Sequence, residues 1–121
     1  MFHTKRLIAE FQREREVLMF CDLHGHSKKL NSFIYGCNTA ANGGFLTWTK
    51  VRLFPRVLAR NTHLFAFKDC RFRVELNKVG TARVVCWKQF QITNSFTLES
   101  SFFGYEYGKD DILELGALEY R

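Results

Sequence analysis

The sequence predicts an α/β fold in which helices flank a sheet, and three observations support this prediction. Helical and strand-like segments follow one another along the chain, an order typical of a sheet with helices packed against it. Residues 17–21 form a continuous apolar run, which is typical of a strand buried on both faces of a sheet that helices cover. A length of 121 residues with 46% hydrophobic residues fits one domain with a hydrophobic core.

The first predicted element is a helix over residues 5–16. Leu7, Ile8 and Phe11 fall on one face at helical spacing, and the remaining residues are mostly charged. Residues 17–21 follow as a strand, because the apolar run is about one strand long and a glycine-containing turn comes after it.

The middle of the chain predicts a strand, a loop and a helix. Residues 32–36 are a second short apolar segment, and residues 37–44 are rich in Asn, Thr, Ala and Gly, as loops are. Pro55 fits the first turn of a helix that continues to about residue 60. Backbone N–H groups in the first turn make no hydrogen bond within the helix, so proline, which lacks an N–H, loses nothing there.

The pattern in the last third of the chain predicts two strands and a final helix, and it leaves residues 81–87 undecided between helix and strand. Alternation in residues 71–76 indicates a half-exposed strand, and residues 92–102 show the same pattern with polar residues on one face. Thr81 fits the N-cap of a helix over residues 81–87, but a strand suits Val84 and Val85 equally. Acidic residues before position 112 favour a helix over 112–120.

The net charge of +6 has two readings, a solvated basic face or a surface that attracts anionic partners. No run of five or more basic residues occurs, which argues against a basic tail. The four cysteines form no Cys-x-x-Cys pair, so a zinc ribbon is not expected. Their apolar surroundings predict buried free thiols, as in a reducing compartment. With no apolar N-terminal segment and no membrane-length apolar run, we expect a cytoplasmic protein.

His24 is the first candidate for chemistry. It follows the predicted buried strand, at the edge where α/β sheets bind ligands. A neutral imidazole there can bind zinc, with Asp22 or a backbone group holding its other nitrogen. The alternative is a surface or hydrogen-bonded histidine. His26 points the same way as His24 if the segment is extended.

Glu99 is the second candidate, on the polar face of the last predicted strand. A carboxylate in that position can act as the general base that metal-assisted hydrolysis requires. The alternative is a carboxylate paired with a neighbouring Lys or Arg. Arg83 and Lys88 can hold a substrate carboxylate, the arginine through two hydrogen bonds, or they are ordinary surface charges.

Four segments, in this order, resemble the later part of the catalytic domain of the cytosolic carboxypeptidases, over about residues 7–109. The segments are CDLHGHSKK (21–29), FKDCRF (67–72), GTARVVCW (80–87) and NSFTLESSF (94–102). The resemblance implies a mixed carboxypeptidase-type sheet flanked by helices. It also implies that His24 is a zinc ligand, that Glu99 is the catalytic carboxylate and that Arg83 recognises an acidic side chain.

The family removes glutamates from protein C-termini and polyglutamyl side chains, notably on tubulin, so the resemblance implies zinc as cofactor and glutamate-rich protein tails as partners. Neither a membrane nor a nucleic acid is an expected partner. The family also binds zinc through an earlier His-x-x-Glu pair, which occurs nowhere in the 121 residues. We therefore expect residues 1–121 to be the C-terminal portion of an incomplete catalytic domain, inactive alone. The alternative function is a non-catalytic basic module that binds nucleic acid or other anions.

Overall fold

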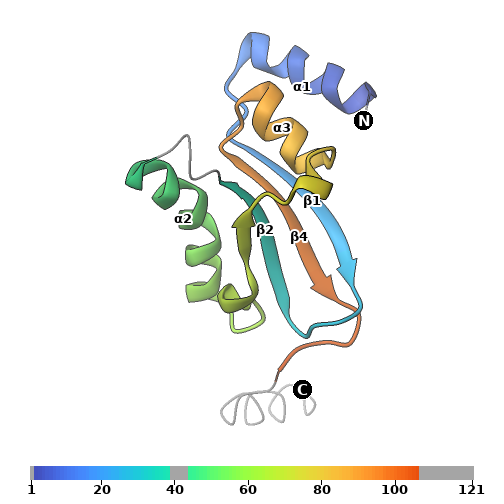
Figure 1. The fold of residues 1–121 in the computed structure, drawn as a ribbon, viewed down its shortest axis with the longest axis vertical. Coiled ribbons are helices and arrows are strands. Elements are labelled where there is room, and N and C mark those ends of the chain that lie inside the picture. Colours follow the sequence, from blue (N-terminus) through green and yellow to red (C-terminus); the bar gives the residue numbers. More distant parts are fainter. Residues whose placement is uncertain (1, 39–43, 107–121) are drawn as a thin grey trace, which may run out of the picture.

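The computed structural model describes residues 2–38 and 44–106. These residues form a four-stranded sheet with helices on both faces (Figure 1), which confirms the predicted α/β class. The elements are α1 (Phe2–Glu14), β1 (Met19–His26), β2 (Ser32–Asn38), α2 (Phe45–Asn61), β3 (Arg71–Arg73), α3 (Ala82–Phe90) and β4 (Asn94–Ser101), with single 3-10 turns at Phe67–Asp69 and Leu76–Lys78.

The sheet is mixed, as the family resemblance implied, and its strand order is β1-β4-β2-β3. The last described strand, β4, therefore lies between the first two. It runs parallel to β1 and antiparallel to β2, and β3 pairs in parallel with the outer side of β2. This insertion brings residues near the start and near the end of the chain onto neighbouring strands.

Opposite faces of the sheet hold different helices. Phe96 of β4 packs in a core cluster with Val51 of α2, Phe33 and Ile34. The preceding residue, Ser95, points the other way, and its hydroxyl donates to the carbonyl oxygen of Arg83 in α3 at 2.7 Å. Helix α2 thus covers one face and α3 the other. Helix α1 packs beside α3 through a second cluster, which contains Ile8, Cys86, Ile92 and the partly buried Phe20.

Helix α2 starts ten residues before its predicted first turn. It begins at Phe45, so the prediction that Pro55 opens the helix is wrong, and Pro55 lies inside it. A proline there costs about 3 kcal/mol or more, because it removes a helical hydrogen bond. Val51 and Pro55 are one turn apart, and both are buried against the sheet. This packing offsets the local preference, which is why the sequence pattern misplaced the start.

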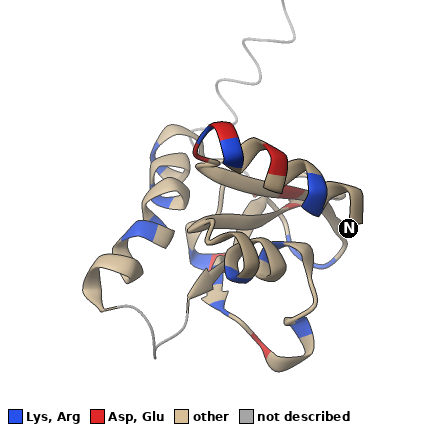
Figure 2. Ribbon diagram, turned by 90° about the horizontal axis from the view of Figure 1, so that it is seen from above, with Lys and Arg blue, Asp and Glu red and all other residues tan. Residues whose placement is uncertain are grey.

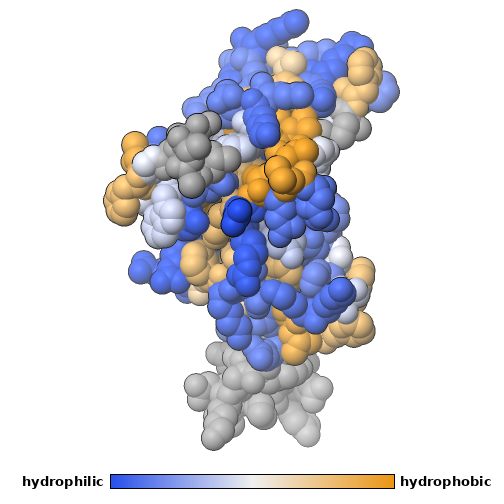
Figure 3. Space-filling model, in the orientation of Figure 1, coloured by the Kyte–Doolittle hydropathy of each residue, from blue (hydrophilic) through white to orange (hydrophobic). Residues whose placement is uncertain are grey.

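The apolar run at residues 17–21 predicted a strand buried on both faces. This prediction is wrong for β1, which is exposed on one face. The strand runs from Met19 to His26 and forms an edge of the sheet among the described residues. Leu23 is 74% exposed, since α2 packs over β2 and β4 and leaves the adjacent face of β1 uncovered. In the view of Figure 3, hydrophilic side chains dominate the surface, and hydrophobic ones are exposed in separate patches.

The helix predicted over residues 5–16 is α1 (Phe2–Glu14), but of its predicted apolar face only Ile8 is buried, while Leu7 and Phe11 are exposed. Strand β2 continues to Asn38, so it takes up the first residues of the predicted loop over 37–44, and residues 39–43 lie outside the described ranges. The strand predicted over 71–76 shortens to Arg71–Arg73. The open segment 81–87 is helical, with Thr81 preceding α3 as predicted. The predicted final helix over 112–120 lies outside the described residues.

Three of the four cysteines are buried, as predicted, and Cys21 is exposed on β1, which corrects that part of the prediction. All four are free thiols. Burial raises the pKa of Cys37 to about 11, and it also raises the pKa values of Cys70 and Cys86. Within the part of the chain that the structure describes, no helix is both long enough and apolar enough to cross a membrane.

We predict that iodoacetamide at pH 8.5 modifies Cys21 in the native chain and leaves the other three cysteines unmodified. The reagent attacks an accessible thiolate. Burial raises the pKa of all four thiols, Cys21 included, so the selectivity depends on the inaccessibility of Cys37, Cys70 and Cys86. Intact-mass analysis is expected to show one adduct before denaturation and four after it. The Cys21→Ser variant serves as control and should show none before denaturation; rapid native labelling of Cys70 or Cys86 would contradict this packing.

Candidate active site

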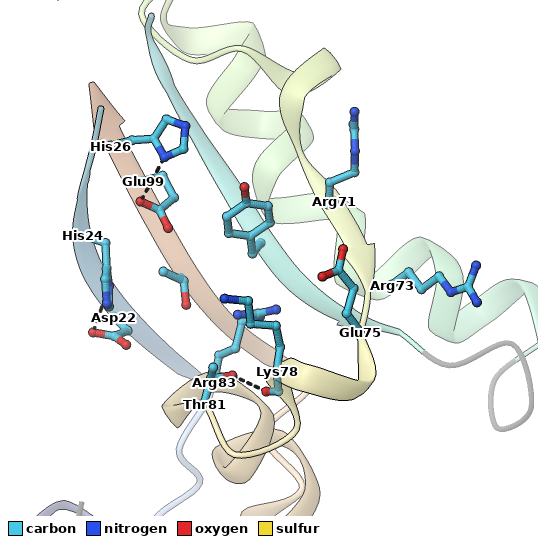
Figure 4. Close-up of a pocket in the computed structure, with 12 residues that line it drawn as sticks. Asp22, His24, His26, Arg71, Arg73, Glu75, Lys78, Thr81, Arg83 and Glu99 are labelled. Carbon is cyan, nitrogen blue, oxygen red and sulfur yellow. Dashed lines mark hydrogen bonds and ion pairs between the residues drawn. The ribbon is translucent and has the colours of Figure 1, made fainter. Parts of the chain in front are cut away.

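A polar pocket of about 380 Å³ opens on the α3 face of the sheet (Figure 4). Its walls combine carboxylates, imidazoles and cationic groups, and they draw on β1, β2, β3, β4 and the start of α3. The lining residues are Asp22, His24, His26, Tyr35, Arg71, Arg73, Glu75, Lys78, Thr81, Arg83, Thr97 and Glu99. The three site residues predicted from the sequence are all among them.

His24 and Glu99 lie side by side because β1 and β4 are paired in parallel. The pairing register sets His24 directly opposite Glu99 and Asp22 opposite Thr97. Neighbouring strands are about 4.8 Å apart, and residues in register point to the same face. The sheet therefore brings an imidazole and a carboxylate into one pocket from distant parts of the chain.

The imidazole of His24 is oriented by Asp22. The Nδ1 atom of His24 lies 3.4 Å from Oδ1 of Asp22, two residues earlier on the same face of β1. The sequence had placed His24 just past the end of the strand, but the residue lies within β1. With Nδ1 directed to a carboxylate, Nε2 is the nitrogen left for a metal ion, the usual arrangement of a metal-binding histidine. Its side chain is 51% exposed, so a ligand can reach it.

Glu99 has no Lys or Arg partner among the described residues. Its ionic neighbour is His26, whose Nδ1 lies 3.8 Å from Oε2 of Glu99. Both side chains are largely shielded, and the His26 ring packs edge-on against Phe33 at 4.9 Å. The alternative of a pair with a lysine or arginine is thus absent from this part of the chain. Strand β1 also carries His26 on the same face as His24, as expected for an extended segment.

Arg83 lines the pocket but is itself held by the protein. It comes from the first turn of α3 and is 7% exposed. Its guanidinium lies 5.5 Å from the Tyr35 ring centroid, and Nε donates to the carbonyl oxygen of Gly36 at 3.5 Å. Lys88, the other basic candidate, is exposed at the far end of α3 and is not part of the pocket wall.

Sequence reasoning missed the cationic wall contributed by the segment around β3. Arg71 and Arg73 line the pocket, while Phe72 between them is buried on the opposite face. Lys78 follows from the turn before α3. The alternation of arginine and apolar residues in 71–76 was visible in the sequence. It could not show that this side of the segment lines the same pocket as His24 and Glu99, because that depends on β3 pairing with β2.

Known proteins similar to this chain are cytosolic carboxypeptidases. Cytosolic carboxypeptidase 2 from Xenopus tropicalis and its counterpart from Homo sapiens are both 44% identical over 109 residues, which is 89% of this chain. Cytosolic carboxypeptidase 3 from Mus musculus is 42% identical over 110 residues. The chain belongs to the cytosolic carboxypeptidase family. It spans only 11 to 12% of the length of these three relatives.

A solved structure supports the carboxypeptidase fold. A metallo-carboxypeptidase from Burkholderia cenocepacia superposes with a TM-score of 0.61 at 18% identity, over 78% of this chain and 24% of that one. No protein-family model matches the chain. The mixed sheet described above is therefore a carboxypeptidase-type sheet, as the resemblance implied.

The described residues supply only part of the ligand set that the zinc implied by the family would need. No group of three or more His, Cys, Asp or Glu side chains that could hold a metal occurs in residues 2–38 and 44–106. Catalytic zinc sites normally use three protein ligands. His24, oriented by Asp22, fits one of the three, so these residues do not form a complete zinc site by themselves.

We predict that the 121-residue chain binds zinc weakly. Complete structural zinc sites reach about 10–16 kcal/mol of apparent binding free energy, and a site with one or two ligands should fall far short. Competition against a chromophoric chelator is expected to leave the zinc on the chelator, with the same result for His24→Ala. Stoichiometric zinc held at sub-micromolar affinity, and lost in His24→Ala, would contradict the partial site.

Proposed function

We propose that residues 1–121 form the C-terminal portion of a zinc carboxypeptidase catalytic domain and supply it with one zinc ligand, His24, and the catalytic carboxylate, Glu99. The observation that carries the proposal is the parallel register of β1 and β4, which sets these two residues side by side in one pocket. The identity of 42 to 44% with cytosolic carboxypeptidases supports it.

Glu99 is the proposed proton carrier. Its carboxylate accepts a proton from the attacking water and then delivers that proton to the amine that leaves. The absence of a Lys or Arg partner among the described residues supports this role, because a tight ion pair would weaken the base. A bound zinc would polarise the scissile carbonyl. The remaining ligands must come from outside these residues, so we propose that the chain alone is inactive.

The proposed substrates are glutamate-rich protein tails, with tubulin as a candidate. The cationic wall supports this choice, since Arg71, Arg73, Lys78 and Arg83 outnumber the carboxylates that share the pocket. Arginine binds carboxylates through a planar pair of N–H groups, which suits a glutamate side chain or a C-terminal carboxylate. The proposal includes a cytoplasmic location, which the buried free thiols and the names of the relatives support.

We predict that Glu99→Gln abolishes peptidase activity in a version extended upstream to include a His-x-x-Glu pair. Glutamine keeps the shape of the side chain and cannot carry the proton, so kcat should fall by about 10²-fold or more. Glu14→Gln, on the exposed surface of α1, removes the same charge and should leave kcat unchanged. Release of glutamate from a polyglutamate peptide measures both variants; full activity of Glu99→Gln would refute the assignment.

We predict that Arg71→Gln/Arg73→Gln in the same extended protein raises KM for acidic peptides by about tenfold, on the basis of roughly 1.4 kcal/mol of lost interaction. For a peptide with Gln in place of Glu, KM should change little, since these side chains act through charge. Arg13→Gln/Arg15→Gln, near the end of α1, is the matched control. Equal loss with both peptides would remove these arginines from acidic recognition.

A further inference from the structure

A second concave surface lies on the opposite face of β3 from the active-site pocket. This α2 groove, about 500 Å³ in volume, runs between α2 and the 3-10 turn Phe67–Asp69. Its walls are aromatic, aliphatic and cationic, with no acidic residue. They include Trp48, Arg52, Leu53, Arg56, Phe67, Lys68 and Phe72. Helix α2 itself contains no Asp or Glu, and Figure 2 shows only basic residues among its charged ones.

Arg52 is fixed between two aromatic rings. Its guanidinium carbon lies 4.4 Å from the ring centroids of both Trp48 and Phe72, and its Nη1 donates to the carbonyl oxygen of Trp48 at 2.9 Å. Burial lowers the pKa of Arg52, a sign of desolvation, and no described carboxylate pairs with it. A desolvated, unpaired cation favours an anionic ligand, and the edge of the guanidinium is the part left to bind one.

Arg56 repeats this arrangement one helical turn further along α2. Its guanidinium carbon lies 4.7 Å from the Phe67 ring centroid. Side chains four residues apart lie about 5–6 Å from one another on a helix, so the two arginines form adjacent binding points. At the rim, Lys68 already holds a carboxylate of the chain, with its Nζ 3.2 Å from Oε2 of Glu106. The groove thus combines prearranged cations with an apolar floor.

We propose that the α2 groove binds an acidic peptide segment, at a site separate from the active-site pocket. Carboxylates of the peptide pair with Arg52 and Arg56, and its apolar atoms rest on the exposed side chain of Leu53. A nucleic acid fits less well, because bases need free aromatic faces on which to stack, and guanidinium groups lie over Trp48, Phe67 and Phe72. This inference depends on neither Glu99 nor zinc.

The test uses the fluorescence of Trp48 in the 121-residue chain. Trp48 and Trp87 are its two tryptophans, so Trp87→Phe leaves a reporter inside the groove. Titration with a decaglutamate peptide is expected to give a saturable change. Replacing Arg52 and Arg56 with Gln should weaken binding by about tenfold or more, as expected for lost charge-assisted hydrogen bonds. Lys50→Gln/Arg60→Gln removes the same charge from α2 outside the groove and should leave the affinity unchanged.

Two further variants separate this groove from the active-site pocket. Arg73→Gln should preserve the Trp48 response, because this side chain lines the pocket on the other face, whereas Arg71 also donates to the carbonyl oxygens of Lys68 and Cys70 in the groove wall. Arg56→Gln alone, at an exposed position, should still weaken binding if the double variant fails to fold. Equal losses in the Arg52/Arg56 and Lys50/Arg60 variants would overturn the proposal. So would a Trp48 response that polyuridine reproduces at the same charge concentration, or one that Arg73→Gln abolishes.

Discussion

The parallel pairing of β1 with β4 is the constraint on which the candidate site depends. It joins the first and last described strands, and its register sets His24 opposite Glu99. Side chains alternate between the faces of a sheet, so a slip of one residue would turn Glu99 toward α2 and away from the pocket. The hydroxyl of Ser95, bonded to the carbonyl of Arg83, ties α3 to the same strand. The β1–β4 pairing therefore positions both the pocket and its main chemical groups.

Strand β3 separates two sites with related chemistry. Its arginines line the active-site pocket, and Phe72 between them forms part of the α2 groove. The electrostatic environments of the two sites differ. In the pocket, cations share the space with Asp22, Glu75 and Glu99, whereas the groove has cations and aromatic rings without acidic residues. Basic side chains thus line a concave surface on each face of the sheet among the described residues.

The partial zinc site and the small fraction of the relatives' length that the chain covers are consistent with each other. The chain corresponds to 11 to 12% of the length of those carboxypeptidases, and the described residues offer one oriented histidine where a catalytic zinc needs three ligands. The uncovered face of β1, with Leu23 exposed, leaves apolar surface on the side of that strand opposite to the histidine. These features fit a proposal in which another part of a catalytic domain completes both the metal site and the sheet.

The sequence by itself determined the α/β class, the presence of helix α1 and strand β4, and the choice of His24 and Glu99 as candidates, because periodicity and motif order are local properties. Tertiary structure decided the burial of β1, the start of α2 and the exposure of Cys21. Whether an apolar strand is covered depends on where a distant helix packs, and α2 lies over β2 and β4. The cationic wall from β3 was hidden for the same reason, since strand pairing sets which face of an alternating segment meets the site.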